Sequence, residues 1–341
     1  MSVASAIKTG DAAELPGKRD EDWRWTDLRG LIRQVPPDSA PAAAVGAGPF
    51  DGAAEEIVVI ANGEGAAHIG VDPHGDRTVA LRIVSRGDGS HAARVSIDVE
   101  ADGRLTLLES YEGEGSYLSQ TGLVFSLGVG AQVERVVLAA DDAEGVTVSE
   151  AEVQLAAEAS FGQTVITGGA RRQRLQTTVR HPGGHANLRL DGVYLLADKR
   201  HADLTTVVTH EGLDGVTEQL AKGVVRDQAR GVFQGRIVVA EGADRTDARM
   251  GHHALILSDR AEVDARPELE IYADDVSCAH GNTVGRLDED ALFYARQRGM
   301  PDDVARALLT EAFVGEVVER IGHEPARDIA AAWVAERLRG G

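Results

Sequence analysis

Short runs of alternating apolar and polar residues fill the middle of the chain, from about residue 55 to residue 285. Examples are EEIVVIANG, RVSIDVEADGRLTLL and LVFSLGVGAQVERVVL, which are bounded by Gly, Asp and Asn. A period of two indicates β-strands, because successive side chains of a strand point to opposite faces. No convincing amphipathic helical pattern longer than two turns interrupts the stretch. It therefore predicts an all-β region of roughly 230 residues.

A small residue in a polar turn recurs ahead of these runs. Its positions are Ala131, Ala159, Ala186, Ala202, Ala229 and Ala261. Most successive intervals are about 27–32 residues, with one of 16. A repeat of that length, filled by two or three strands, favours the coils of a β-solenoid. A β-sandwich is the alternative, because sandwiches also turn every 8–12 residues or so.

The segment before the β-region has a different pattern. It contains Trp23 and Trp25, two of the three tryptophans, in a stretch expected to be helical over Asp20–Arg33. Two exposed tryptophans would be costly, so we expect this segment to dock on another surface. Residues 34–50 are rich in Pro, Ala and Gly and predict a linker.

Helical periodicity begins after Asp288, which is a suitable N-cap, and Gly299 is a suitable terminator. Pro301 can open a second helix, and a third is predicted over about Ala326–Leu338. The second helix has two adjacent apolar rows, either intramolecular core or partly a surface for another protein: Val304, Leu308 and Ala312, then Leu309, Phe313, Val317 and Ile321. The expected domains are residues 1–50 (helical segment and linker), 51–286 (β-core) and 287–341 (helical domain).

Charge and composition narrow the classes of function. The chain has 35 Lys and Arg against 55 Asp and Glu, a net charge of −20. A field of that sign repels nucleic acid and anionic lipid, which favours proteins or cations as partners. The single cysteine fits a reducing compartment, and neither a secretory signal nor an apolar run of about 20 residues is present. We therefore expect a soluble cytoplasmic protein with no nucleic-acid or membrane partner.

The main candidate for chemistry is Cys278, two residues before His280. On a strand both side chains point to one face, roughly 6.5–7 Å apart, and an iron or small iron–sulfur unit could bind both. The alternative is a structural cysteine beside a satisfied histidine. A nucleophilic Cys–His pair needs a general base within hydrogen-bond reach and an oxyanion hole, and these positions are somewhat too far apart. Glu268 and Glu270 share an outer face, which we expect to be solvated rather than to guide a metal.

Other histidines are weaker candidates. His252 and His253 are adjacent, so on a strand they point to opposite faces and would rarely ligate one metal together. The sequence HPGGH, from His181 to His185, predicts a turn.

Two blocks of the chain resemble a known family. The first is GADRTDARMGHHALILSDRAEVDARPELEIYADDVSCAHGNTVGRLDEDALFYARQRGMPDDVARALLTEAF, and the second is LPGKRDEDWRWTDL. They are similar to the C-terminal and N-terminal signatures of the SufB/SufD family of the SUF iron–sulfur cluster assembly system, on its SufD side, with Trp25 where Tyr is more usual. The resemblance covers roughly residues 14–31 and 241–322. It implies a parallel, right-handed β-helix core with flanking helical parts.

The resemblance also implies partners and site residues. It implies a non-enzymatic scaffold that pairs with the paralogue SufB through the β-helices, with a homodimer reasonable in isolation. His280, with Cys278 as its neighbour, would hold a transient iron–sulfur cluster shared with SufB, and the isolated chain would carry no cofactor. The contact with the ATPase SufC would map to these residues: Met300, Pro301, Ala305, Leu308, Leu309, Ala312 and Phe313.

The chain departs from the family in two respects. It has little helical sequence before the β-region, and ARMGHH lacks the Gln and Asn residues expected there. SufB itself would be expected to carry further cysteines, which this chain lacks. The alternative to a scaffold subunit is a stand-alone metal-dependent or thiol enzyme on an all-β framework.

Overall fold

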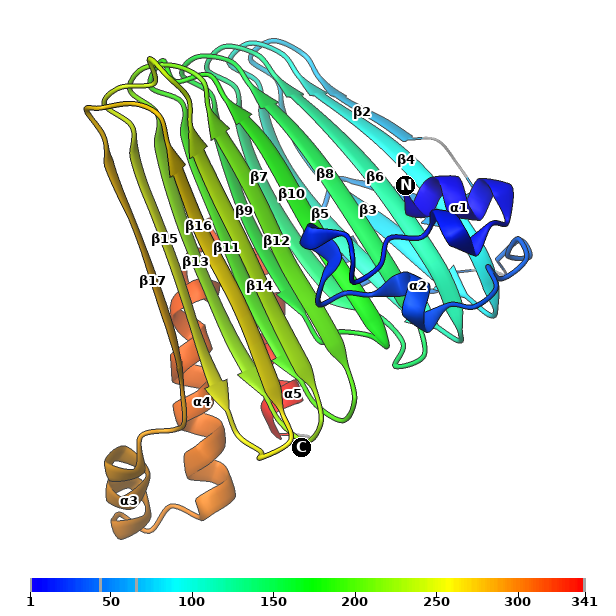
Figure 1. Cartoon of the computed structure of the whole chain (residues 1–341), viewed down its shortest axis with the longest axis vertical. Helices are drawn as coiled ribbons and strands as arrows, with labels where there is room; N and C mark the ends of the chain where they lie inside the picture. Colours follow the sequence, from blue (N-terminus) through cyan, green and yellow to red (C-terminus); the bar gives the residue numbers. More distant parts are fainter. Residues whose placement is uncertain (1, 43–44, 65–66, 340–341) are drawn as a thin grey trace.

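A computed structural model describes residues 2–42, 45–64 and 67–339. Its centre is a β-solenoid in which each coil gives one strand to each of two sheets (Figure 1). The odd-numbered strands form one sheet in the order β1-β3-β5-β7-β9-β11-β13-β15-β17, and the even-numbered strands form the other from β16 back to β2. Neighbouring strands within each sheet run parallel, as in the pair β10 and β12. The prediction of a β-solenoid is confirmed, and the sandwich alternative is wrong.

The two sheets are called the odd sheet and the even sheet below. The odd sheet contains β1 (Glu56–Ala61), β3 (Asp76–Arg86), β5 (Arg104–Glu114), β7 (Gln132–Ala140), β9 (Ser160–Thr167), β11 (Asn187–Leu196), β13 (Val216–Val225), β15 (Asp247–Ile256) and β17 (Ser277–Gly285). The even sheet contains β2 (Ala67–Val71), β4 (Gly89–Val99), β6 (Tyr117–Leu127), β8 (Val146–Leu155), β10 (Arg172–His181), β12 (His201–His210), β14 (Arg230–Val239) and β16 (Glu262–Ile271).

The strand register explains the repeat seen in the sequence. Ser160 pairs with Asn187, 27 positions on, and Arg230 pairs with Glu262, 32 positions on. The alanines of the repeat are buried where strands begin. Those at 131, 159 and 186 precede odd strands, whereas those at 202, 229 and 261 mark the starts of even strands. The interval of 16 residues is therefore the step from one corner of the coil to the other.

One corner of the solenoid repeats a backbone conformation as well as a residue type. Where an even strand passes to the next odd strand, one residue in each coil has a positive φ, between 56° and 69°. Its identities along the stack are His74, Asp102, Gly130, Glu158, His185, Asp214 and Arg245. Left-handed backbone of this kind favours glycine and short polar residues, which is why the turns interrupt the apolar runs so regularly. HPGGH is one of these turns, as predicted.

The main core lies between the two sheets and is built from inward-facing apolar side chains of successive coils. Phe125 and Phe161 meet there edge to face, with ring centroids 5.4 Å apart. Fully burying an aromatic or branched aliphatic side chain stabilises the fold by about 1.5–3 kcal/mol. The rows of Val, Leu and Ile along the stack therefore hold the coils in register.

The N-terminal segment lies across the outer face of the even sheet (Figure 1). It contains α1 (Val3–Thr9), α2 (Leu28–Leu31) and short 3-10 turns, including Glu21–Trp23. The expectation of a helix over Asp20–Arg33 is wrong, because Asp27 caps a new short helix and breaks the run. The expectation that this segment docks is confirmed, since Leu28 is buried with Leu118 and Val148 of the sheet.

Three helices follow β17, close to the predicted positions: α3 (Glu289–Gln297), α4 (Asp302–Val318) and α5 (Glu324–Arg339). Asp288 caps α3 through its carboxylate, and Gly299 has a φ of +89°. Helices α4 and α5 pack against the outer face of the odd sheet, while α3 projects past the strand ends (Figure 1). In the part of the chain that the structure describes, no helix is long and apolar enough to cross a membrane.

Candidate functional site

The inner face of β17 is the surface on which Cys278 and His280 lie. Register pairs Cys278 with Ala248, His280 with Met250, and Val284 with Ala254 on β15. The three partners on β15 are buried, whereas Cys278 is half-buried and His280 and Val284 are exposed. Burial therefore falls at the last coil, because β17 has no further strand beside it in the described fold. The same positions that form core in earlier coils form an open end here.

Cys278 and His280 differ in their surroundings. The thiol of Cys278 packs against the edge of the core, near Leu269 and Val276. Burial, with the nearby charge of Asp247, raises the pKa of the Cys278 thiol. His280 is exposed and makes no hydrogen bond or ion pair to any described residue. A thiol with a raised pKa is the opposite of an activated nucleophile, so this geometry gives no support to a thiol enzyme.

Within residues 2–42, 45–64 and 67–339, no group of three or more His, Cys, Asp and Glu side chains is placed to hold a metal ion. The structure thus brings the two predicted ligands to one strand face and adds no third ligand from the described chain. His252 and His253 point to opposite faces, as predicted, since His252 is buried and His253 is partly exposed.

A buried hydrogen-bonded chain runs beside the open end. Asn282 of β17 contacts His252 Nδ1 through its side-chain oxygen at 2.7 Å, and His252 Nε2 lies 2.9 Å from the hydroxyl of Tyr194. The His252 ring also stacks on Phe233, with centroids 4.7 Å apart. Burial lowers the pKa of His252 to about 4, so the ring is neutral near pH 7. This chain anchors β17 two residues after His280.

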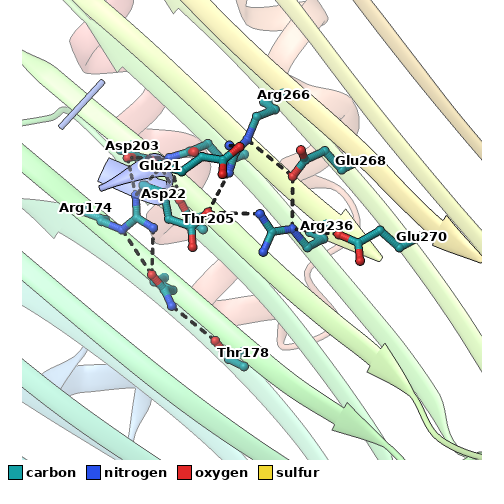
Figure 2. A network of polar contacts seen from close by, with 12 residues as sticks. Glu21, Asp22, Arg174, Thr178, Asp203, Thr205, Arg236, Arg266, Glu268 and Glu270 are labelled. Carbon is teal, nitrogen blue, oxygen red and sulfur yellow. Dashed lines mark hydrogen bonds and ion pairs between the residues drawn. The ribbon is translucent and has the colours of Figure 1, made fainter. Parts of the chain in front are cut away.

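The acidic residues before Cys278 belong to an ion-pair network on the outer face of the even sheet (Figure 2). Arg236 lies 3.1 Å from Glu268 and 3.6 Å from Glu270, and Arg266 lies 3.4 Å from Glu268. The expectation of a merely solvated face is therefore wrong. The physical reason is register, because each carboxylate stands beside an arginine of its own strand or of the next coil.

The network continues into the N-terminal segment through Asp22. Arg266 donates to the Asp22 carboxylate at 2.7 Å, and Arg236 at 3.1 Å. Arg174 donates to the backbone carbonyl of Asp22 and, at 2.8 Å, to the buried carboxylate of Asp203. The guanidinium of Arg174 also lies 4.4 Å from the centroid of the Trp23 ring. Our reasoning from the sequence missed this network, although Arg174 and Asp203 are separated by 29 residues, one coil of the repeat.

The residues expected to contact an ATPase divide by exposure. Leu308 is 50 % exposed, and Val304 in the same row is 49 % exposed. Pro301 and Ala312 are also exposed, and Met300 and Leu309 are half-buried. Ala305 is fully buried, and the ring of Phe313 packs toward the odd sheet with Lys222 4.6 Å from its centroid. One apolar row of α4 thus faces the solenoid, and the other faces outward with Phe293 and Tyr294 of α3.

Fold and site together define a parallel β-solenoid scaffold with one uncovered end and a helical appendage. A model of the SUF system FeS cluster assembly SufBD core domain matches residues 82–313. This match covers more than half of the chain, so the chain belongs to the SufBD family of SUF-system iron–sulfur cluster assembly proteins.

Individual relatives agree with this assignment. The chain is 34 % identical over 224 residues to the iron–sulfur cluster assembly protein SufD of Escherichia coli K12, covering 65 % of this chain and 53 % of that protein. It is 34 % identical over 137 residues to SufD of Bacillus subtilis, covering 40 % and 31 %. A SufBD family protein of Synechocystis is 30 % identical over 195 residues, covering 57 % and 43 %. The chain spans about half the length of the curated relatives that it matches, or less.

Proposed function

We propose that this chain is a non-enzymatic scaffold subunit that helps to assemble iron–sulfur clusters and supplies His280, with Cys278 beside it, to a nascent cluster. The observation that carries the proposal is the inner face of β17, where an exposed imidazole and a half-buried thiol share an uncovered solenoid end. Imidazole and thiolate are suitable ligands for iron. The family membership supports the same reading.

The partner at the open end would be a second β-solenoid, SufB, with a second copy of this chain in its absence. Both last strands, β16 and β17, have a free edge in the described fold. Ile271, Tyr272 and Val284 expose apolar surface there. Free strand edges beside apolar side chains favour association with another chain. Ligands from the partner would complete the cluster site, and the cluster would be cargo shared between subunits.

The outward row of α4 would bind the ATPase SufC. Pro301, Leu308 and Ala312 offer exposed apolar surface, flanked by the partly covered Met300 and Leu309. The buried Ala305 and the sheet-facing Phe313 would act by supporting this surface rather than by direct contact. Because α3 directly follows β17, movement of the helices on ATP binding could reach the strand that carries His280.

The substitution Val284→Lys tests the pairing. It places a charge on the open end without removing a core contact of an earlier coil, because Val284 is 45 % exposed. We expect the variant to lose SufB while retaining SufC when the three proteins are co-expressed without oxygen. The matched control is Val129→Lys, at a surface turn where the valine is 52 % exposed, and it should retain both partners. A Val284→Lys variant that binds SufB as well as the control does would overturn the proposed interface.

A further inference from the structure

A groove of about 670 Å³ lies between the ends of the odd strands and the C-terminal helices. Leu195, Val224 and Leu257 line it from the solenoid side, and Thr310 and Trp333 line it from α4 and α5. Its volume falls in the range of sites that bind small organic molecules, about 300–1,000 Å³. None of the residues proposed above to hold a cluster belongs to it.

Three arginines line the groove, and two of them have no carboxylate partner. Arg337 donates to the carbonyl of Gly168 at 3.3 Å and lies 4.9 Å from the centroid of the Trp333 ring. Arg200 donates to the carbonyls of Asp141 and Gly169. Neither arginine forms an ion pair with any described residue. The third, Arg226, reaches only the neighbouring Asp227, at 3.9 Å.

The local electrostatics favour an incoming anion. Arg337 is partly buried, and its burial together with the nearby charges of Arg200 and Arg226 lowers the pKa of its guanidinium. Grouping three like charges beside an apolar wall is unfavourable unless a counter-charge is present. The acidic Asp302 at the groove is already bound by Arg306 at 2.6 Å. The cluster is also opposite in sign to the chain as a whole, which carries −20.

The backbone leaves room for Arg337 in this position. A Cβ atom added at Gly168 would lie 2.3 Å from the guanidinium carbon of Arg337. A side chain at that position would therefore push the arginine away from the groove. The absence of a side chain at Gly168 and the stacking of Arg337 on Trp333 hold the guanidinium at the groove wall.

We propose that this groove binds a small organic phosphate. A guanidinium matches the phosphate group because two parallel N–H bonds can reach two of its oxygens. The phosphate would lie against Arg337, Arg200 and Arg226, and the organic part would lie against Trp333 and Leu257. This inference does not depend on the cluster-assembly function proposed above.

Isothermal titration calorimetry of the full chain tests the site with two probes, 1-naphthyl phosphate and inorganic pyrophosphate. Arg337→Gln and Arg226→Gln should each weaken binding of both probes by about tenfold or more, as expected for lost charge-assisted hydrogen bonds. Trp333→Ala should weaken naphthyl phosphate more than pyrophosphate. The matched control is Arg180→Gln, an exposed arginine on β10, which should bind both probes like the unsubstituted chain.

Circular dichroism melts of each variant show whether it is folded, and Arg226→Gln provides a test if Arg337→Gln does not fold. Equal weakening by Arg337→Gln and Arg180→Gln would show general surface attraction and overturn the proposal. Failure of the unsubstituted chain to bind either probe would also overturn it.

Discussion

The carboxylate of Asp203 is predicted to hold the N-terminal segment on the solenoid, and its removal should be costly. Asp203 is fully buried on β12 and accepts hydrogen bonds from Arg174, Thr205, Gln234 and Thr26. Asp203→Ala would leave the buried guanidinium of Arg174 without its ion-pair partner. Breaking a buried pair on one side costs about 3–5 kcal/mol, because the remaining charge stays desolvated. We therefore expect the free energy of undocking the segment to fall by about that amount.

The assay is a urea titration followed by tryptophan fluorescence, together with limited trypsin digestion. Trp23 stacks on Arg174, so its emission reports whether the segment is docked. Solenoids can lose their terminal elements separately from their central coils. The segment should therefore be released at a lower urea concentration than the coils, and cleavage at Arg24 and Arg29 should accelerate in Asp203→Ala.

Glu211→Ala provides a matched control, because Glu211 pairs with Arg180 on the same sheet but both side chains are exposed. An exposed pair contributes about 0–1 kcal/mol. The double variant Arg174→Met with Asp203→Leu should recover part of the lost stability, since no unpaired charge remains. If Asp203→Ala is as mild as Glu211→Ala, and trypsin cleaves both equally, the network does not anchor the segment.

Two further predictions concern the tail helices and pH. Leu308→Asp should abolish SufC co-purification, because it places a carboxylate in an interface that would bury about half of a leucine, whereas Ala331→Asp on the exposed face of α5 should not; retained binding by Leu308→Asp would show that SufC uses another surface. Between pH 6.5 and 4 the unfolded chain binds a proton at His252 that the folded chain, with a His252 pKa of about 4, does not. Stability should therefore fall with pH by about 1.4 kcal/mol per unit for this group, and urea midpoints of His252→Gln should depend less steeply on pH; an unchanged slope would contradict the buried neutral ring.

Alternation and turn residues were sufficient to predict the solenoid, because a strand side chain has only two directions and each coil needs a polar corner. The same alternation placed Cys278 and His280 on one face. The ends of α3, α4 and α5 followed from Asp288, Gly299 and Pro301, which act locally through capping and backbone conformation.

Long-range features were out of reach for physical reasons. The pairing of Arg174 with Asp203 depends on a coil of 29 residues at that place, whereas coil length varies from 27 to 32 along the stack. The arginines of the groove come from two strand ends and a helix, and no local pattern joins them. The direction of each apolar row of α4 depended on how the helix packs on the odd sheet.

Cluster content of the reconstituted complex tests the central claim most directly. The chain, with SufB and SufC, would be purified without oxygen, and iron and sulfide would be measured for each complex. His280→Ala should lower both while leaving complex formation intact, because the exposed imidazole has no structural partner among the described residues. His68→Ala, an exposed histidine on β2 at the other end of the solenoid, should leave both unchanged. Iron and sulfide in His280→Ala equal to those of the unsubstituted complex would contradict the account.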